Sequence, residues 1–153
     1  CTPDNSISII EDFIQKHNDF DIKLIHHKEN GGLSVVRNTG IENSNGEYIY
    51  FLDSDDDITN DCIEKLVKNA LENDTEMVIA QNRWINTFDN STKDYGFATN
   101  FSKLIFLDNF SIFKAYCEGS FPVSSWNKIV KLSFIKENKI KFFYSIWRHL
   151  SVV

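Results

Sequence analysis

The chain has 153 residues, which is enough for one domain with a hydrophobic core. Hydrophobic residues make up 42% and charged residues 25%, a globular composition that argues against a disordered chain. The net charge of −6, from 16 basic and 22 acidic side chains, argues against a nucleic-acid binder that works through bulk positive charge.

The cysteines and the apolar runs bear on where the protein works. Cys1, Cys62 and Cys117 are an odd number without metal-type spacing, so we interpret them as reduced thiols. No apolar run approaches the ~18–20 residues that cross a bilayer, and no signal-peptide pattern opens the chain. We therefore expect a cytoplasmic domain, with peripheral association at the inner face of the membrane as an alternative.

The first half of the chain alternates between helical and strand-like patterns. Ser6 can cap the first helix, and apolar residues recur after it at helical spacing. The inner side of the second helix is expected to carry Leu33, Val36, Gly40 and Ile41. In chain order we expect a helix over 6–17, a strand over 22–26, a turn over 30–32, a helix over 33–43, a turn at 45–46 and a strand over 48–52.

The second half continues this alternation. Thr59 or Asn60 is expected to cap the next helix, and Asp61 is favourable near its N-terminus. Its apolar side is expected to be Ile63, Leu66, Val67, Ala70 and Leu71. We then expect a strand over 77–80, a loop or weak hairpin over 86–100, a helix over 108–117, a loop over 119–125, a short helix over 132–138 and a strand over 140–143. The alternation predicts an α/β fold, with a mixed, mostly parallel sheet flanked by helices.

Four acids follow the most strongly predicted strand within five positions: Asp53, Asp55, Asp56 and Asp57. Open α/β sheets place ligands at the C-terminal ends of their strands. Carboxylates packed this closely repel one another, and hard divalent cations prefer oxygen ligands. The cluster therefore predicts a metal-dependent site for a phosphate-bearing substrate.

Four interpretations of the acidic cluster compete. An EF-hand has acids at the positions of Asp53, Asp55 and Asp57, but it needs a Gly where the chain has Ile58, and its loop follows a helix. A haloacid-dehalogenase-type phosphotransferase also ends a strand in Asp-x-Asp, but normally on its opening strand. The third interpretation is a metal site for a nucleotide sugar, and the fourth is a solvated turn before a helix.

Neighbouring motifs favour the nucleotide sugar. Residues 30–41 are NGGLSVVRNTGI, residues 46–49 are GEYI, and residues 51–56 are FLDSDD. This series closely resembles the family 2 glycosyltransferases of the GT-A fold, whose pattern reads Asn-x-Gly-x-Ser-x-Ala-Arg-Asn-x-Gly, then Gly-Glu-Tyr-Ile, then Phe-Leu-Asp-x-Asp-Asp. Residues 1–6 resemble the end of that family's Asp-Gly-Ser-Thr-Asp-Asn-Ser turn, and residues 126–129 resemble its Trp-Asn-Lys element. The resemblance extends to about residue 142.

The resemblance implies roles for the acids. Asp55 is the candidate ligand of Mn²⁺ or Mg²⁺, and Asp53 is expected to contact the donor's ribose or to share the metal. Asp56 is expected to support the cluster or to face the acceptor.

Residues outside the cluster are also implicated by resemblance. Arg37 is assigned to the donor site, where a guanidinium could offset phosphate charge, although a salt bridge to the acids would also explain it. Asn30 and Asn38 could hydrogen-bond the donor or simply cap turns. Trp126 could form an acceptor-side wall, since sugars stack on aromatic faces, or it could belong to the core.

Two features of the family pattern are not found. The opening strand would precede Cys1, so we expect the chain to be a fragment. Inverting members use a carboxylate as general base after a Phe like Phe142, whereas no Asp or Glu follows Glu137 here. The catalytic base is therefore unassigned, with His149 as a weak substitute, and we expect that the divergent tail 143–153 reflects truncation or a frameshift.

Together these observations predict a single, incomplete GT-A domain over 1–153. Residues 1–85 are expected to bind the nucleotide sugar, and residues 86–142 to form the acceptor side. The implied activity is metal-dependent, inverting transfer of a sugar from a nucleotide-diphosphate sugar, with UDP as the expected nucleotide, to a glycan or lipid-linked glycan in bacterial polysaccharide synthesis. The alternative is a non-catalytic remnant that retains at most metal or diphosphate binding.

Overall fold

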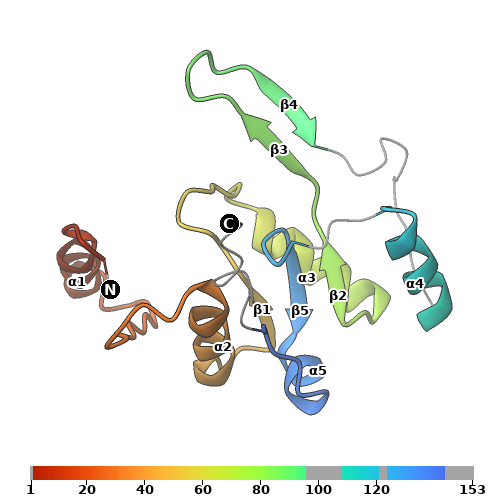
Figure 1. Ribbon diagram of the computed structural model, residues 1–153, viewed down its shortest axis with the longest axis horizontal. Helices are drawn as coiled ribbons and strands as arrows, with labels where there is room; N and C mark the ends of the chain where they lie inside the picture. The colour runs from red at the N-terminus through yellow and green to blue at the C-terminus, as the bar shows by residue number, and fades with distance from the viewer. Residues whose placement is uncertain (1, 96–107, 121–123, 144–153) are drawn as a thin grey trace, which may run out of the picture. The chain divides into compact units, whose positions relative to one another are not determined.

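The computed structural model describes residues 2–95, 108–120 and 124–143. The chain divides into two compact units, which are unit 1 (residues 1–42 and 142–153) and unit 2 (residues 43–141). The elements, labelled in Figure 1, are α1 (Ser6–Lys16), α2 (Leu33–Asn43), β1 (Tyr48–Tyr50), α3 (Cys62–Asn73), β2 (Met77–Ile79), β3 (Asn82–Ile85), β4 (Thr92–Tyr95), α4 (Asn109–Cys117), β5 (Lys128–Lys131) and α5 (Leu132–Glu137).

Unit 2 is built on a three-stranded sheet in the order β1-β5-β2. The central strand β5 runs antiparallel to both neighbours, with Ile129 opposite Tyr50 on one side and opposite Val78 on the other. Helix α3 contacts β2 and β5 and lies across one face of the sheet (Figure 1). The strands β1 and β2 therefore run in the same direction but are separated by β5.

The core of unit 2 forms where α3 meets the sheet. Leu66, Ala70 and Ile129 are buried together, and Ala70 is 0% exposed. The partly buried residues packed against this cluster are Tyr48, Tyr50, Cys62, Val67, Val78 and Ala80. The prediction that Leu66 and Ala70 face inward is therefore confirmed. Ile63 and Leu71, which were expected beside them, are 40% and 60% exposed.

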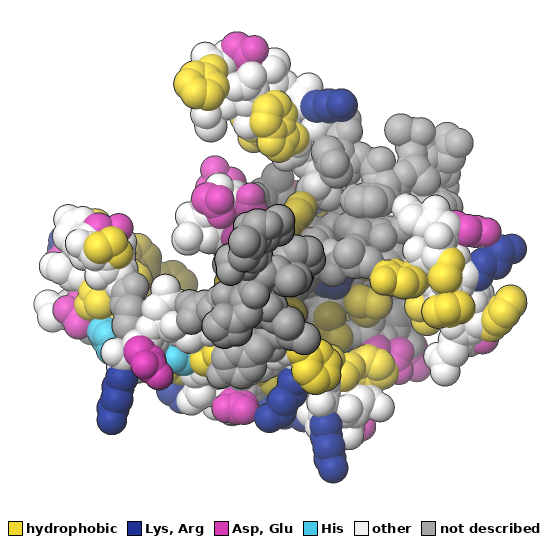
Figure 2. All heavy atoms as spheres, viewed as in Figure 1, with side chains coloured by type: hydrophobic (Ala, Val, Ile, Leu, Met, Phe, Trp, Pro, Cys, Tyr) yellow, Lys and Arg dark blue, Asp and Glu magenta, His cyan; other side chains and the backbone are white. Residues whose placement is uncertain are grey.

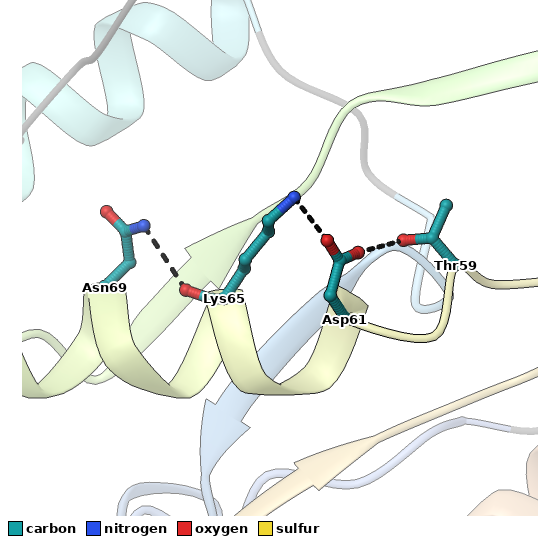
Figure 3. A network of polar contacts seen from close by, with 4 residues as sticks. All are labelled: Thr59, Asp61, Lys65 and Asn69. Atoms are coloured by element: carbon teal, nitrogen blue, oxygen red, sulfur yellow. Dashed lines mark hydrogen bonds and ion pairs between the residues drawn. The ribbon is translucent and has the colours of Figure 1, made fainter.

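Polar contacts along the solvent side mark the start of α3. Thr59 Oγ1 donates to Asp61 Oδ1 at 2.8 Å, and Lys65 Nζ pairs with Asp61 Oδ2 at 2.6 Å (Figure 3). Asn69 Nδ2 donates to the carbonyl oxygen of Lys65 one turn later. The helix begins at Cys62 with Asp61 as its N-cap, one or two residues after the predicted cap, because the chain from Thr59 to Asp61 forms a turn that leads into the helix.

The weak hairpin expected over 86–100 is present, but it begins earlier. Strand β3 pairs antiparallel with β4, from Asn82 opposite Tyr95 to Ile85 opposite Thr92. Residues 96–100 of the expected hairpin lie outside the described residues. The helix expected at 108–117 is also confirmed, and Asp108 caps it by accepting a hydrogen bond from the Ser111 N–H at 2.8 Å.

Unit 1 contains α1, a tight turn and most of α2. The Gly32 N–H donates to Asn30 Oδ1 at 2.9 Å, and Gly32 adopts a φ of 77°, which glycine tolerates without strain. A Cβ on Gly31 would lie 3.0 Å from the Val35 side chain, so this position also favours glycine. Of the residues expected on the inner side of α2, Ile41 is buried, whereas Leu33 and Val36 are more than half exposed.

Several strand predictions were wrong. Residues 22–26 and 140–143 are not strands, because neither segment pairs with another strand in the described residues. The α/β class is confirmed, but all pairings between the named strands are antiparallel rather than mostly parallel. The reason is β5, which was not predicted and which lies between β1 and β2. In the described ranges, no helix has both the length and the apolar character that a bilayer-crossing helix requires.

Candidate functional site

The acidic segment, residues 53–57, lies immediately beyond the end of β1. Ile49, at the centre of the strand, is buried. After the strand, the Asp56 N–H donates to the Asp53 carbonyl oxygen at 3.1 Å, which closes a turn. Asp53 is half-buried, whereas Asp55, Asp56 and Asp57 are exposed. Figure 2 shows acidic side chains gathered over this loop between β1 and α3. The segment thus presents several carboxylates to solvent from the end of a paired strand.

The carboxylates influence one another electrostatically. Loss of hydration and then the negative charges of Asp55, Asp53 and Asp57 raise the pKa of Asp56. Burial, with smaller contributions from Cys62 and Asp56, raises the pKa of Tyr50 at the end of β1. A cation bound here would relieve this mutual repulsion.

The structure brings Trp126 to the same edge of the sheet. A parallel bridge joins Trp126 to Phe51, which is two residues before Asp53. Trp126 is half-buried, and its position next to the acidic segment is compatible with the predicted acceptor-side role. That role stays a prediction.

The residue after Trp126 was missed as a candidate. Asn127 is only 2% exposed, and both its side chain and its backbone are hydrogen-bonded to Ala80, the residue after β2. The next residue, Lys128, is 9% exposed, and its Nζ donates to the Ser124 carbonyl oxygen. Burial lowers the pKa of Lys128 to about 8. The Trp-Asn-Lys resemblance pointed to these residues but gave them no role.

The remaining candidates belong to unit 1, where two of them contact Phe142. The Asn38 side chain donates to the Phe142 carbonyl oxygen at 2.8 Å and accepts from the Phe142 N–H at 2.9 Å. The Arg37 guanidinium carbon lies 5.4 Å from the centre of the Phe142 ring, which is a cation–π distance. Asn30 shapes the glycine turn before α2. Contacts of these residues with the donor stay predictions. A donor contact of the Asn38 side chain would compete with its two hydrogen bonds to Phe142.

The acidic segment suits a divalent metal ion that takes only one or two of its ligands from the protein. Within the described ranges, no three His, Cys, Asp or Glu side chains are grouped so that they could hold a metal ion by themselves. Mg²⁺, however, usually binds through one or two carboxylates plus substrate phosphates and water. The exposed carboxylate of Asp55, the half-buried Asp53 two residues before it and the raised pKa of Asp56 suit that kind of site.

A family model decides the classification. The model described as "Glycosyl transferase family 2" matches residues 1–133. The chain belongs to glycosyl transferase family 2. The predicted family is therefore confirmed, and the match includes the acidic segment and the turn around Trp126 (residues 124–128, the Trp126 turn).

Individual relatives agree with this assignment. EpsH of Bacillus subtilis (strain 168) is 35% identical over 141 residues, which cover 91% of this chain and 38% of EpsH. The poly(ribitol-phosphate) beta-N-acetylglucosaminyltransferase TarP of Staphylococcus aureus (strain N315) is 36% identical over 115 residues, which cover 75% of this chain and 32% of TarP. The chain thus spans well under half the length of these relatives.

The crystal structure of S. aureus TarS 1-349 supports the fold. The two structures match with a TM-score of 0.65 at 20% sequence identity, over 92% of this chain and 38% of the TarS chain. At this identity the similarity concerns the fold alone, and it confirms the α/β glycosyltransferase architecture.

Proposed function

We propose that this family 2 chain transfers a sugar from a nucleotide-diphosphate sugar, with UDP as the nucleotide, to a glycan acceptor. The observation that carries the proposal is the exposed acidic segment at the end of β1, in a chain that the family model matches over residues 1–133. Open α/β sheets bind ligands at this position. A cluster of carboxylates there can recognise a diphosphate only with a cation between them.

Asp55 and Asp53 would hold the metal, Mn²⁺ or Mg²⁺. Enzymes of this family generally depend on a divalent metal. When bound, the ion would neutralise the charge on the leaving nucleoside diphosphate. Asp53, half-buried beside the Phe51–Trp126 bridge, can hold its carboxylate in a defined place. Asp56 lies on the exposed side of the segment and would face the acceptor or support the other carboxylates.

The family resemblance also proposes Arg37, Asn30 and Asn38 of unit 1 as donor-binding residues. Arg37 carries a permanent positive charge that could offset phosphate charge. Asn30 shapes the Gly31–Gly32 turn, so its role would be to present the backbone before α2 to the donor. Asn38, which engages Phe142 with both polar groups of its amide, would mainly hold the chain around Phe142 in place.

The acceptor would be a glycan or a lipid-linked glycan. Trp126 offers an aromatic surface beside the acidic segment, and aromatic surfaces stack on sugars. The name of TarP specifies transfer to poly(ribitol-phosphate), and this supports a polymeric acceptor here as well. A lipid-linked acceptor would bring the protein to the inner face of the membrane. We expect inversion at the anomeric carbon, by in-line attack of an acceptor hydroxyl.

Calorimetric titration of UDP into the purified chain, with and without Mn²⁺, tests the proposal. We expect binding that requires Mn²⁺ and that weakens by at least ~10–100-fold in Asp55→Ala, because even outer-shell partners of a metal contribute that much. Glu72→Ala is the matched control, since Glu72 is an exposed acid of α3 that only pairs with Lys68 at 3.9 Å. Equal weakening in both variants, or binding unaffected by Mn²⁺, would contradict the proposed metal site.

A non-catalytic binding role is the second candidate. It is favoured by residues 143–153, which contain no Asp or Glu although the family pattern places the general base several residues after a Phe like Phe142. Release of sugar from a UDP-sugar, followed by chromatography, separates the two candidates. Turnover that Asp55→Ala abolishes would exclude the binding role, whereas Mn²⁺-dependent binding without turnover would favour it.

A further inference from the structure

The turn that carries Trp126 is held by the side chain of one buried residue. Asn127 Nδ2 donates to the Ala80 carbonyl oxygen at 3.2 Å, and Asn127 Oδ1 lies 3.3 Å from the Ser124 hydroxyl, which donates to it. The same Nδ2 lies 3.5 Å from Asn82 Oδ1. One amide therefore connects the start of the turn, the residue after β2 and the first residue of β3.

The backbone of Asn127 adds to this connection. The Ala80 N–H donates to the Asn127 carbonyl oxygen at 2.7 Å, so Asn127 and Ala80 are joined through both backbone and side chain. The φ angle of Asn127 is 114°, a conformation that a residue with a Cβ keeps only where its surroundings hold it. The hydrogen bonds of the Asn127 side chain stabilise this backbone conformation, because they would be broken if the backbone relaxed.

The position of Trp126 follows from this arrangement. Trp126 precedes Asn127 and bridges to Phe51, and Phe51 leads into the acidic segment through Leu52. On the other side of Asn127, the register of β5 places Ile129 opposite Tyr50. Residues on both sides of Asn127 therefore pair with β1 or with Phe51 just after it, directly before the acidic segment.

We propose that Asn127 is a positioning residue, which holds Trp126 against Phe51 and thereby sets the conformation of residues 51–57 for ligand binding. This proposal rests on the proposed function for its purpose, but not for its geometry. Asn127 acts through Trp126 and Phe51 rather than by touching the donor. Replacing Asn127 should therefore disturb the acidic segment more than the core of unit 2.

Amide hydrogen exchange measured by NMR tests the geometry without any ligand. In Asn127→Ala we expect exchange at the Asp56 amide, which donates to the Asp53 carbonyl oxygen, to accelerate about fivefold to tenfold, as for the loss of one net hydrogen bond. The amides of Ile49 and Ile129, in the paired strands, should keep their rates. Asn69→Ala is the matched control, since it removes an exposed amide from α3.

A second variant covers the case in which Asn127→Ala does not fold. Asn127→Gly keeps the backbone conformation accessible but removes the amide. It should accelerate exchange over residues 51–57 as well, by more than at Ile49 and Ile129, and it should weaken Mn²⁺-dependent binding of UDP. Wild-type exchange in Asn127→Gly, or equal acceleration throughout the sheet, would overturn the proposal.

The two proposals can fail separately. If the wild-type chain binds no UDP but Asn127→Gly loosens residues 51–57, the proposed donor is wrong and the positioning role stands. If the wild-type chain binds UDP with Mn²⁺ and Asn127→Gly binds and exchanges equally, the positioning role is overturned and the proposed function stands.

Discussion

Two segments meet at one edge of the sheet and differ in how they are held. The acidic segment (residues 53–57) is mostly exposed, and one backbone hydrogen bond, from Asp56 to Asp53, closes its turn. The Trp126 turn (residues 124–128) ends in two buried polar residues, Asn127 and Lys128, and two hydrogen bonds join Asn127 to Ala80, the residue after β2. They lie side by side through the bridge from Phe51 to Trp126.

The difference indicates that the acidic segment and the Trp126 turn have separate roles. Exposed carboxylates remain hydrated and free to exchange water for a metal or a diphosphate, but they contribute little to stability. Buried amides stabilise only when they are hydrogen-bonded, and they then fix the backbone. We infer that one segment contacts the ligand, while its neighbour supplies the rigidity that the first one lacks.

The largest expected effect lies in the strand that follows the Trp126 turn. Ile129 is 1% exposed and packs in the core against Leu66 and Ala70. Ile129→Ala should lower the free energy of unfolding by ~2–5 kcal/mol, because it leaves a cavity in addition to the lost burial. Urea unfolding followed by circular dichroism measures this. The control is Ile63→Ala on α3, where the side chain is 40% exposed and the loss should be about 1 kcal/mol.

A similar loss in both variants would contradict the comparison. It would mean that the residues around β5 are no better packed than the start of α3, which follows the acidic segment. The Trp126 turn could then not serve as the rigid neighbour.

A smaller effect is expected from pH at Lys128. Burial lowers its pKa to about 8 in the folded chain, from 10.5. Between these values Lys128 binds more protons in the unfolded chain, so this residue makes the stability of the wild type rise with pH across the window, by at most about 1.4 kcal/mol per pH unit. The raised pKa values of Cys62 and Tyr50 act in the opposite direction, and they are common to the wild type and the variants. Lys128→Met should remove this rise, as measured by urea unfolding at pH 7, 8, 9 and 10.

The control for this experiment is Lys131→Met at the other end of β5, which leaves Lys128 in place and should keep the rise. If Lys128→Met shows the same pH dependence as the wild type, the ammonium group is not desolvated. The Trp126 turn would then be more open to water than its burial indicates.

Helices were predicted well because their signals are local. The starts of α4 and α2 depend on Asp108 and on the Asn30–Gly32 turn, which lie within a few residues of the helix in the sequence. Strands were predicted poorly, because a strand also needs a partner elsewhere in the chain. Residues 22–26 have a strand-like composition but pair with no strand in the described residues. Strand β5 was missed, since its sequence KIVK begins with a lysine that turns out to be buried.

The same distinction separates the two segments of the site. Four acids after an apolar strand are visible in the sequence, so the acidic segment could be proposed without a structure. The role of Asn127 depends on Ala80 and Asn82, which are 47 and 45 residues away in the chain. Nothing local to Asn127 indicates that its amide is buried and bonded, and only the fold shows this.

The smallest expected effect is a gain in stability from the acidic segment itself. The raised pKa of Asp56 means that the folded chain holds this proton more tightly than the unfolded chain, so stability falls as the pH rises above the usual range of an aspartate. Asp56→Asn should remove this fall and raise the free energy of unfolding at pH 7 by a few tenths of a kcal/mol, since the group is exposed and screened. Urea unfolding at about 10 mM and about 1 M salt measures this. The part of the gain that comes from Asp55, Asp53 and Asp57 should be lost at high salt, where charges are screened within about 3 Å, and the part that comes from lost hydration should remain. A loss of stability in Asp56→Asn would show that a partner holds this carboxylate, and the acidic segment would then be part of the scaffold rather than its exposed counterpart.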